Sequence, residues 1–145
     1  MPYLQEGINI YMSRLRHYLS VEITALADLK SSRSLTADLQ KAKEGEQILA
    51  NIGAGDYVAL LDERGTEMSS RQWAEFLQKR MSSGISRLVF VVGGPYGFSQ
   101  AVYDRANALV SFSRMTFSHE MIRLFFVEQL YRGMTILRGE PYHHD

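Results

Sequence analysis

The chain has 145 residues, of which 46% are hydrophobic and 22% charged, and its 16 basic and 16 acidic residues give a formal net charge of zero. This length is typical of one domain that buries about two-thirds of its unfolded surface, and the absence of cysteine excludes disulfides and thiolate metal sites. A neutral chain argues against binding nucleic acid by bulk positive charge. Because no apolar run approaches the ~20 residues that cross a membrane and no signal-peptide pattern occurs, we expect a cytoplasmic protein.

Segments with helical periodicity alternate with short apolar runs along the whole chain. This alternation is typical of an α/β domain with a mostly parallel sheet flanked by helices. In chain order we expect a helix over 3–19, a strand over 21–25, a loop over 31–34, a helix over 36–51, a turn over 53–56, a strand over 57–61, a helix over 69–81, a strand over 88–92, a helix over 99–109, a strand over 112–117, a helix over 119–133 and an irregular tail over 135–145.

The strand over 88–92 runs into a loop that contains Gly93, Gly94, Pro95 and Gly97. Glycines at a strand end leave main-chain groups accessible, and small molecules bind at the carboxyl ends of strands in open α/β sheets. Pro95 lacks the N–H that a pyrophosphate needs at this turn, and the chain has no Walker loop and no G-x-S-x-G elbow. The sequence therefore predicts a ligand held by main chain that is not a dinucleotide.

A metal site is not expected. His143 and His144 are adjacent to Asp145, but neighbouring side chains diverge and a third ligand at a suitable spacing is missing. A surface tail explains these residues better.

Six short motifs follow one another through the chain: Lys43–Gln47, Leu60–Asp62, Gly93–Gly97, Ser118–Arg123, Glu128–Arg132 and Glu140–His143. Together they resemble the bacterial RlmH (YbeA-like) family, the 23S rRNA pseudouridine N3-methyltransferases of the SPOUT class. The resemblance covers essentially the whole chain. It implies a single α/β-knot domain over 1–145, with a C-terminal trefoil knot, a homodimer, and S-adenosylmethionine as cofactor.

The resemblance also implies a substrate and a cofactor site. The substrate is the pseudouridine at position 1915, in helix 69 of 23S rRNA, methylated on the assembled ribosome. By position in the motifs, S-adenosylmethionine contacts Leu61 and Gly93. Leu61 and Phe117 would serve equally well as core residues. The segment that completes the pocket is Phe112, Ser113, Arg114, Met115, Thr116 and Phe117.

The implied reaction moves a sulfonium methyl group to an imide nitrogen that carries a proton at neutral pH, so it needs alignment and a way to remove that proton. We expect His143 to act as the base or as a substrate-orienting group, and Tyr142 to stack on or hydrogen-bond the target base. We expect Arg132 to contact a phosphate or the developing imidate. The alternatives are an i,i+4 ion pair of Arg132 with Glu128 and a Tyr142 that only pins the tail to the core.

The chain departs from the family's pattern at both ends. The family tail commonly ends in Tyr-His-Arg or Tyr-His-Lys, whereas His144 places a titratable cation here. Family members begin with a short apolar strand that precedes the position of Met1, so we expect one strand of the sheet to be missing and an edge to be exposed. Because a fold alone does not give a function, a non-catalytic RNA- or ribosome-binding module on the same fold is the alternative function.

Overall fold

The computed structural model describes residues 2–26, 36–93 and 96–144, so the loop expected over 31–34 and the loop residues Gly94 and Pro95 lie outside the described residues. The chain forms two units. The first consists of Met1–Ile23, Met68–Gly84 and Met115–Asp145, and the second of Thr24–Glu67 and Ile85–Arg114.

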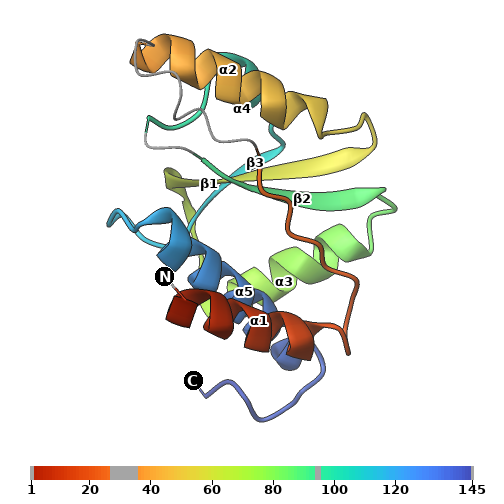
Figure 1. The fold of residues 1–145 in the computed structure, drawn as a ribbon. Coiled ribbons are helices and arrows are strands. Elements are labelled where there is room, and N and C mark those ends of the chain that lie inside the picture. The colour runs from red at the N-terminus through yellow and green to blue at the C-terminus, as the bar shows by residue number, and fades with distance from the viewer. Residues whose placement is uncertain (1, 27–35, 94–95, 145) are drawn as a thin grey trace. The chain divides into compact units, whose positions relative to one another are not determined.

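The second unit contains a three-stranded parallel sheet in the order β2-β1-β3 (Figure 1). The central strand β1 pairs on both sides, with Leu61 opposite Val92 of β2 and Val110 of β3. The three strands therefore end at the same edge of the sheet, and the expected parallel α/β arrangement is confirmed. The strands are β1 (Asp56–Glu67), β2 (Arg87–Val92) and β3 (Ala108–Ser111).

Two helices, α2 (Ala37–Ala50) and α4 (Gln100–Arg105), lie on the same side of this sheet (Figure 1). Val58 and Leu60 alternate along β1 and turn their side chains to the core that these helices share. Each side chain of this kind stabilises the fold by roughly 1.5–3 kcal/mol when it is fully buried. The other members of the core are Ile48, Phe98 and Val102.

Strand β1 is longer than the expected 57–61 because it continues through a bulge. The pairing with β3 shifts between Leu61 and Thr66, and then resumes with Thr66 opposite Val110. At Gly65 a Cβ atom would lie 2.6 Å from the main-chain carbonyl carbon of Leu109 and the amide nitrogen of Val110. Only glycine lets the bulge approach β3 so closely.

The first unit consists of three helices and the C-terminal tail, and α5 packs against both α1 and α3. Gly133 of α5 faces α3 closely, since a Cβ there would lie 2.8 Å from Leu77 Cδ1. The indole N–H of Trp73 donates to the carbonyl oxygen of Gln129 at 2.9 Å. The helices are α1 (Pro2–Leu15), α3 (Ser70–Met81) and α5 (His119–Leu137).

Two of the expected strands are wrong. Residues 21–25 form neither helix nor strand, and Ile23 is 44% exposed, so the alternation there does not mark a buried face.

The strand expected over 112–117 lies earlier, at Ala108–Ser111. Asn107 explains the shift: its main-chain N–H donates to Val58 O at 2.7 Å and its side-chain oxygen accepts from Val58 N at 2.8 Å. These bonds attach the chain to β1 directly after α4, so the helix expected over 99–109 ends at Arg105.

The last helix also extends further than the expected 119–133, to Leu137. Gly139 then adopts a positive φ of 69°. The amide of Gly139 donates to Ile136 O and that of Glu140 to Thr135 O, the pattern of a Schellman motif. This motif reverses the chain, so the tail runs back along α5. Within the described ranges, no helix is long and apolar enough to cross a membrane.

Candidate functional site

The carboxyl edge of the sheet brings together three of the residues expected to hold a cofactor. Leu61 lies in β1 opposite Val92, the last residue of β2, and Gly93 follows Val92 directly. Phe112 follows β3 in the same way. Leu61, Gly93 and Phe112 are all half-buried.

Gly93 is held close to an aromatic ring at this edge. A Cβ atom on Gly93 would lie 2.8 Å from Cζ of Phe98, which is 5% exposed and belongs to the core under α2 and α4. The main chain at Gly93 therefore packs closely against the core. Because Gly93 comes directly after β2, its N–H and C=O groups lie beyond the end of the strand. This is the arrangement that a ligand bound by main chain requires.

Beside Leu61, the bulge in β1 is fixed by a polar network. The carboxylate of Asp62 accepts from Tyr103 Oη at 2.5 Å and from the main-chain N–H of Arg64 at 2.8 Å. The Arg64 guanidinium donates both to Asp62 and to Tyr103 Oη. Burial raises the pKa of Asp62, but these hydrogen bonds and the charge of Arg64 together outweigh it, and the pKa lies below its usual value. Asp62 is thus a fixed anion next to Leu61.

The segment expected to complete the pocket spans both units. Phe112, Ser113 and Arg114 belong to the second, where Ser111 Oγ donates to Ser113 O at 2.9 Å and Arg114 pairs with Glu67 at 2.7 Å. The remaining residues belong to the first unit, where the side chain of Phe117 is 36% exposed and its ring lies 5.0 Å from that of Phe125. The segment is outside helix and strand, so its main-chain groups are outside the sheet ladder.

A second cluster in the first unit contains all three residues expected to act in catalysis. Arg132 Nη2 and Nε donate to Glu128 Oε1 at 2.6 and 3.2 Å, and Arg132 Nη1 lies 3.1 Å from His143 Nδ1. Tyr142 Oη donates to the same Glu128 oxygen at 2.9 Å, and the Arg132 guanidinium lies 4.7 Å from the Tyr142 ring centroid. We call Glu128, Arg132, Tyr142 and His143 the tail cluster. The ion pair and the pinned tyrosine that the sequence offered as alternatives are both present.

Hydrogen-bonding rules fix the protons of the tail cluster. An arginine can only donate, so Nδ1 of His143 accepts from Arg132 and the proton of the neutral ring is on Nε2. Tyr142 uses its single hydroxyl proton on Glu128, so Tyr11 Oη donates to Tyr142 Oη across 3.1 Å. Burial, followed by the hydrogen bonds with Tyr11 and Glu128, raises the pKa of Tyr142 above its usual value, and the phenol stays protonated at neutral pH.

Sequence analysis missed Glu128 and Tyr11 as members of a site. The i,i+4 spacing of Glu128 and Arg132 is visible in the sequence, and it indicates an ion pair but not that the tail joins it. Tyr11 gives no signal beyond its place on an amphipathic helix, because its partner is 131 positions away.

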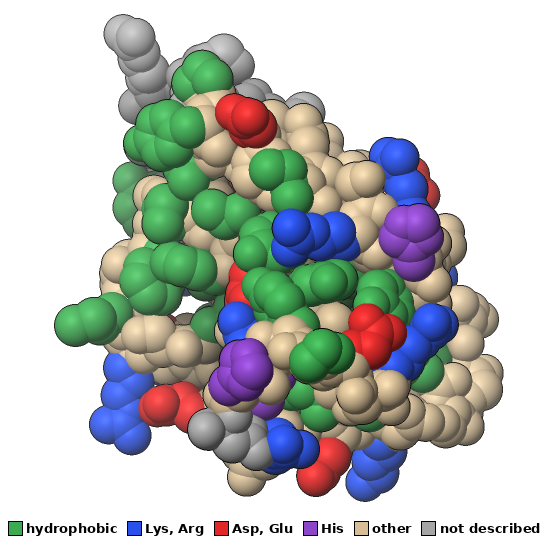
Figure 2. Space-filling model, turned by 90° about the horizontal axis from the view of Figure 1, so that it is seen from below, with side chains coloured by type: hydrophobic (Ala, Val, Ile, Leu, Met, Phe, Trp, Pro, Cys, Tyr) green, Lys and Arg blue, Asp and Glu red, His purple; other side chains and the backbone are tan. Residues whose placement is uncertain are grey.

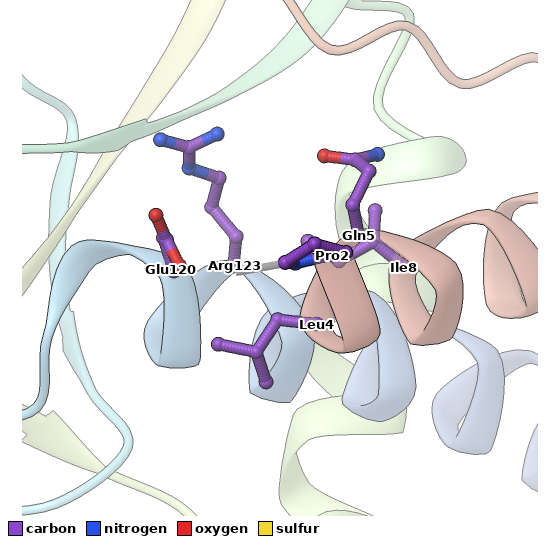
Figure 3. A pocket seen from close by; sticks show the side chains of 6 residues that line it. All are labelled: Pro2, Leu4, Gln5, Ile8, Glu120 and Arg123. Atoms are coloured by element: carbon purple, nitrogen blue, oxygen red, sulfur yellow. The ribbon is translucent and has the colours of Figure 1, made fainter.

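The first unit also has a pocket of about 250 Å³ between the amino-terminal ends of α1 and α5 (Figure 3). It contains none of the expected site residues. Gln5, Glu120 and Arg123 provide its polar lining, and Pro2, Leu4 and Ile8 the rest. Among the described residues, no three His, Asp or Glu side chains come together in a way that could hold a metal ion.

A family model described as "Predicted SPOUT methyltransferase" matches residues 1–143 of the chain. The chain belongs to the SPOUT methyltransferase family. It is therefore an enzyme.

Within the SPOUT methyltransferases, the chain is similar to several curated proteins named Ribosomal RNA large subunit methyltransferase H. The protein from Christiangramia forsetii is 54% identical over 141 residues, which are 97% of this chain and 90% of that one. The one from Parabacteroides distasonis is 54% identical over 143 residues, 99% and 91% of the two chains. The one from Bacteroides fragilis is 53% identical over 139 residues, 96% and 88%. The resemblance seen in the six motifs is confirmed.

Proposed function

We propose that this SPOUT methyltransferase transfers a methyl group from S-adenosylmethionine to N3 of the pseudouridine at position 1915, in helix 69 of 23S rRNA on the assembled ribosome. The similarity to proteins named Ribosomal RNA large subunit methyltransferase H, over nearly the whole chain, carries this proposal. The tail cluster supports it, because it gathers the residues expected to act on the substrate into one hydrogen-bonded group.

The carboxyl edge of the sheet suits S-adenosylmethionine. Leu61 and Phe112 offer apolar surface for an adenine, Gly93 offers main-chain groups, and Ser113 and Arg114 follow Phe112 in the same unit. The Asp62 network keeps the bulge beside Leu61 in one conformation. S-adenosylmethionine would supply an electrophilic methyl group, and the chain's own residues then have to present the acceptor nitrogen in line with it.

For the target base, the geometry favours the orienting role of His143 over the basic one. In the arrangement described here Nδ1 accepts from Arg132, so the proton of the neutral ring is on Nε2 and the orienting role is that of a donor. A hydrogen bond to a uracil carbonyl would orient the base and stabilise the imidate that forms as the N3 proton passes to solvent water. To act as a base, His143 would have to break its hydrogen bond with Arg132, because Nδ1 is the acceptor nitrogen of the ring and Arg132 can only donate.

The contacts of Arg132 favour a role in stabilising the imidate over a role in binding an RNA phosphate. Its guanidinium donates to Glu128 and His143. Its charge is therefore held next to the tail and does not extend toward the phosphate backbone of an RNA. Tyr142 donates its hydroxyl proton to Glu128 and its ring lies against Arg132, so in this arrangement it is suited to stacking on the base.

Recognition of the RNA by shape and a few arginines is consistent with the neutral chain. Figure 2 shows one face of the molecule on which basic and acidic side chains are interspersed rather than gathered by charge. We further propose the homodimer, the trefoil knot and the cytoplasmic location that the resemblance implies. Exposed apolar residues such as Met115, which is 75% exposed, and Phe117 would be covered in a dimer.

The alternative, a non-catalytic RNA- or ribosome-binding module, predicts that S-adenosylmethionine does not bind. Isothermal calorimetry of the full chain with S-adenosylmethionine separates the two. Saturable binding at one site per chain or per dimer supports the methyltransferase, and no heat at millimolar cofactor supports the binding module.

A further inference from the structure

Four tyrosines of the first unit meet where the tail returns to the helices. The ring of Tyr131, on α5, lies 5.8 Å from that of Tyr11, 5.9 Å from that of Tyr18 and 4.7 Å from that of Tyr142. The Tyr18 and Tyr142 rings stand nearly edge-on to it, at 78° and 74°. Such tilted pairs stabilise by about 0.5–1.5 kcal/mol beyond the burial of their area. We call Tyr11, Tyr18, Tyr131 and Tyr142 the tyrosine cluster.

Two of these tyrosines also hold the tail by hydrogen bonds. Tyr18 Oη donates to Glu140 Oε2 at 2.6 Å, and Tyr11 Oη donates to Tyr142 Oη at 3.1 Å. The tail is thus tied at two points separated by one residue, one directly after the Schellman reversal and the other next to His143. The bond to Glu140 raises the pKa of Tyr18 to about 12, so the phenol remains a donor at any physiological pH.

Two arginines contact the rings of the tyrosine cluster. The Arg138 guanidinium lies 4.6 Å from the Tyr18 ring centroid, and that of Arg14 lies 5.3 and 5.5 Å from the Tyr11 and Tyr131 centroids. They hold the rings that carry the two donors.

We propose that Tyr11 and Tyr18 are positioning residues, which fix tail residues 140–143 against α1 and α5 and so set Tyr142 and His143 in the geometry that methyl transfer needs. This inference rests on the proposed function. Without the two bonds, the segment after Gly139 keeps the tail cluster, the ring contact with Tyr131 and the bond from the Glu140 amide to Thr135 O, but it loses the hydrogen bonds from Tyr11 and Tyr18. Tyr142 and His143 then spend less time correctly placed, and the rate falls while cofactor binding at the sheet edge does not change.

The test uses substitutions that remove one hydroxyl and keep the ring. In Tyr11→Phe and Tyr18→Phe we expect kcat for methylation of ribosomes that lack the modification to fall roughly threefold to tenfold each, since a single hydrogen bond is lost. The dissociation constant for S-adenosylmethionine should stay within about twofold. Tyr3→Phe is the matched control, because Tyr3 is on α1 like Tyr11 and is 67% exposed, and we expect it to keep the wild-type rate.

The pair of Tyr18 and Glu140 offers an internal check. If their bond is what matters, Glu140→Ala, which removes the acceptor, should lower kcat about as much as Tyr18→Phe, and the double variant should be no slower than the slower single variant. Additive losses, or Phe variants with wild-type kcat in an active enzyme, would overturn the proposal.

A readout independent of activity separates this proposal from the proposed function. In ¹⁵N spectra of the histidines, His143 should show the tautomer protonated at Nε2 in the wild type and a mixture in the Tyr11→Phe/Tyr18→Phe double variant. An unchanged His143 spectrum in the double variant contradicts the positioning role. A wild-type chain that does not methylate ribosomes contradicts the proposed function alone, and the spectra then decide on the tyrosines.

Discussion

At the scale of single residues, Glu128 organises the candidate catalytic end of the chain. Its Oε1 accepts from Arg132 twice and from Tyr142, and its Oε2 accepts from Gln129 at 3.1 Å. A carboxylate with this many donors fixes the side chains around it, and the loss of its charge leaves Arg132 without a counterion. Glu128 therefore determines how Arg132 and the tail approach each other.

Glu128→Gln should weaken both the fold and the reaction. An amide accepts at one atom only and its NH₂ group opposes the Arg132 guanidinium, so we expect the free energy of unfolding to fall by about 1–3 kcal/mol. We expect methyl transfer to fall at least roughly tenfold, because the tail loses one of its attachments. Urea unfolding and ribosome methylation measure the two effects. Glu46→Gln, at an exposed position of α2, is the control, and an active Glu128→Gln enzyme argues against this role.

At the scale of elements, the parallel sheet could be predicted from the alternation of apolar runs and helical segments, but its third strand could not be placed. In the sequence, no Gly or Pro separates the helical pattern before Asn107 from the apolar run around Leu109. The boundary between α4 and β3 is set by the bond of Asn107 to Val58, which joins positions 49 apart. The positions of Leu61 and Gly93 at the carboxyl edge of the sheet could be predicted, since the ends of their strands are visible in the sequence, whereas Phe112 was expected to begin a strand and was named for the site only through the family resemblance. The tail cluster could not, because it depends on the reversal at Gly139.

The bulge in β1 gives a prediction for Gly65. In Gly65→Ala the new methyl group would meet the main chain of Leu109 and Val110 at 2.6 Å, and backbone cannot move aside as a side chain can. We expect a loss of several kcal/mol, on the order of an overpacked core, and weaker binding of S-adenosylmethionine beside Leu61. Gly53→Ala is the control, since the nearest atom there is 3.5 Å from the added Cβ. Equal thermal stability of the two variants would contradict the bulge geometry.

The first residues of β1 and β2 are joined by an ion pair that gives a pH prediction. Asp56 accepts from Arg87 Nη2 at 2.6 Å and from the Gly53 amide at 2.7 Å. The Arg87 bond and then the Gly53 bond lower the pKa of Asp56 from 3.8 to about 2. Because the folded-state pKa is depressed, this contribution to stability is present above about pH 4 and is lost as the pH falls toward 2.

We therefore expect Asp56→Asn to melt at a lower temperature than the wild type at pH 7, with the difference shrinking between pH 4 and pH 2. Thermal melts across this range measure it. A difference in melting temperature that stays constant down to pH 2 would mean that the carboxylate charge of Asp56 is not what stabilises the strand ends.

At the scale of the whole molecule, the expected cofactor residues Leu61 and Gly93 belong to one unit and the expected catalytic residues Arg132, Tyr142 and His143 to the other. Binding of the cofactor and transfer of the methyl group should therefore be separable by mutation. The sequence motifs could not show this division, since residues of both units alternate along the chain.

The separation is tested by two variants. In Gly93→Ala the added Cβ would lie 2.8 Å from the Phe98 ring, so we expect S-adenosylmethionine binding to weaken at least tenfold and methylation to fall with it.

In His143→Ala we expect cofactor binding to remain within about twofold while kcat falls by a hundredfold or more, typical of a lost catalytic group. Calorimetry and initial rates measure both. Loss of cofactor binding in His143→Ala would contradict the division of roles.

The central claim is that the chain methylates N3 of one pseudouridine in 23S rRNA. Ribosomes from cells that lack the modification are incubated with the purified chain and S-adenosylmethionine labelled in its methyl group, and the labelled nucleotide is mapped by mass spectrometry. We predict one labelled methyl group per large subunit, on N3 of the pseudouridine at position 1915. Label at another nucleotide, or no label with S-adenosylmethionine bound, would contradict the claim.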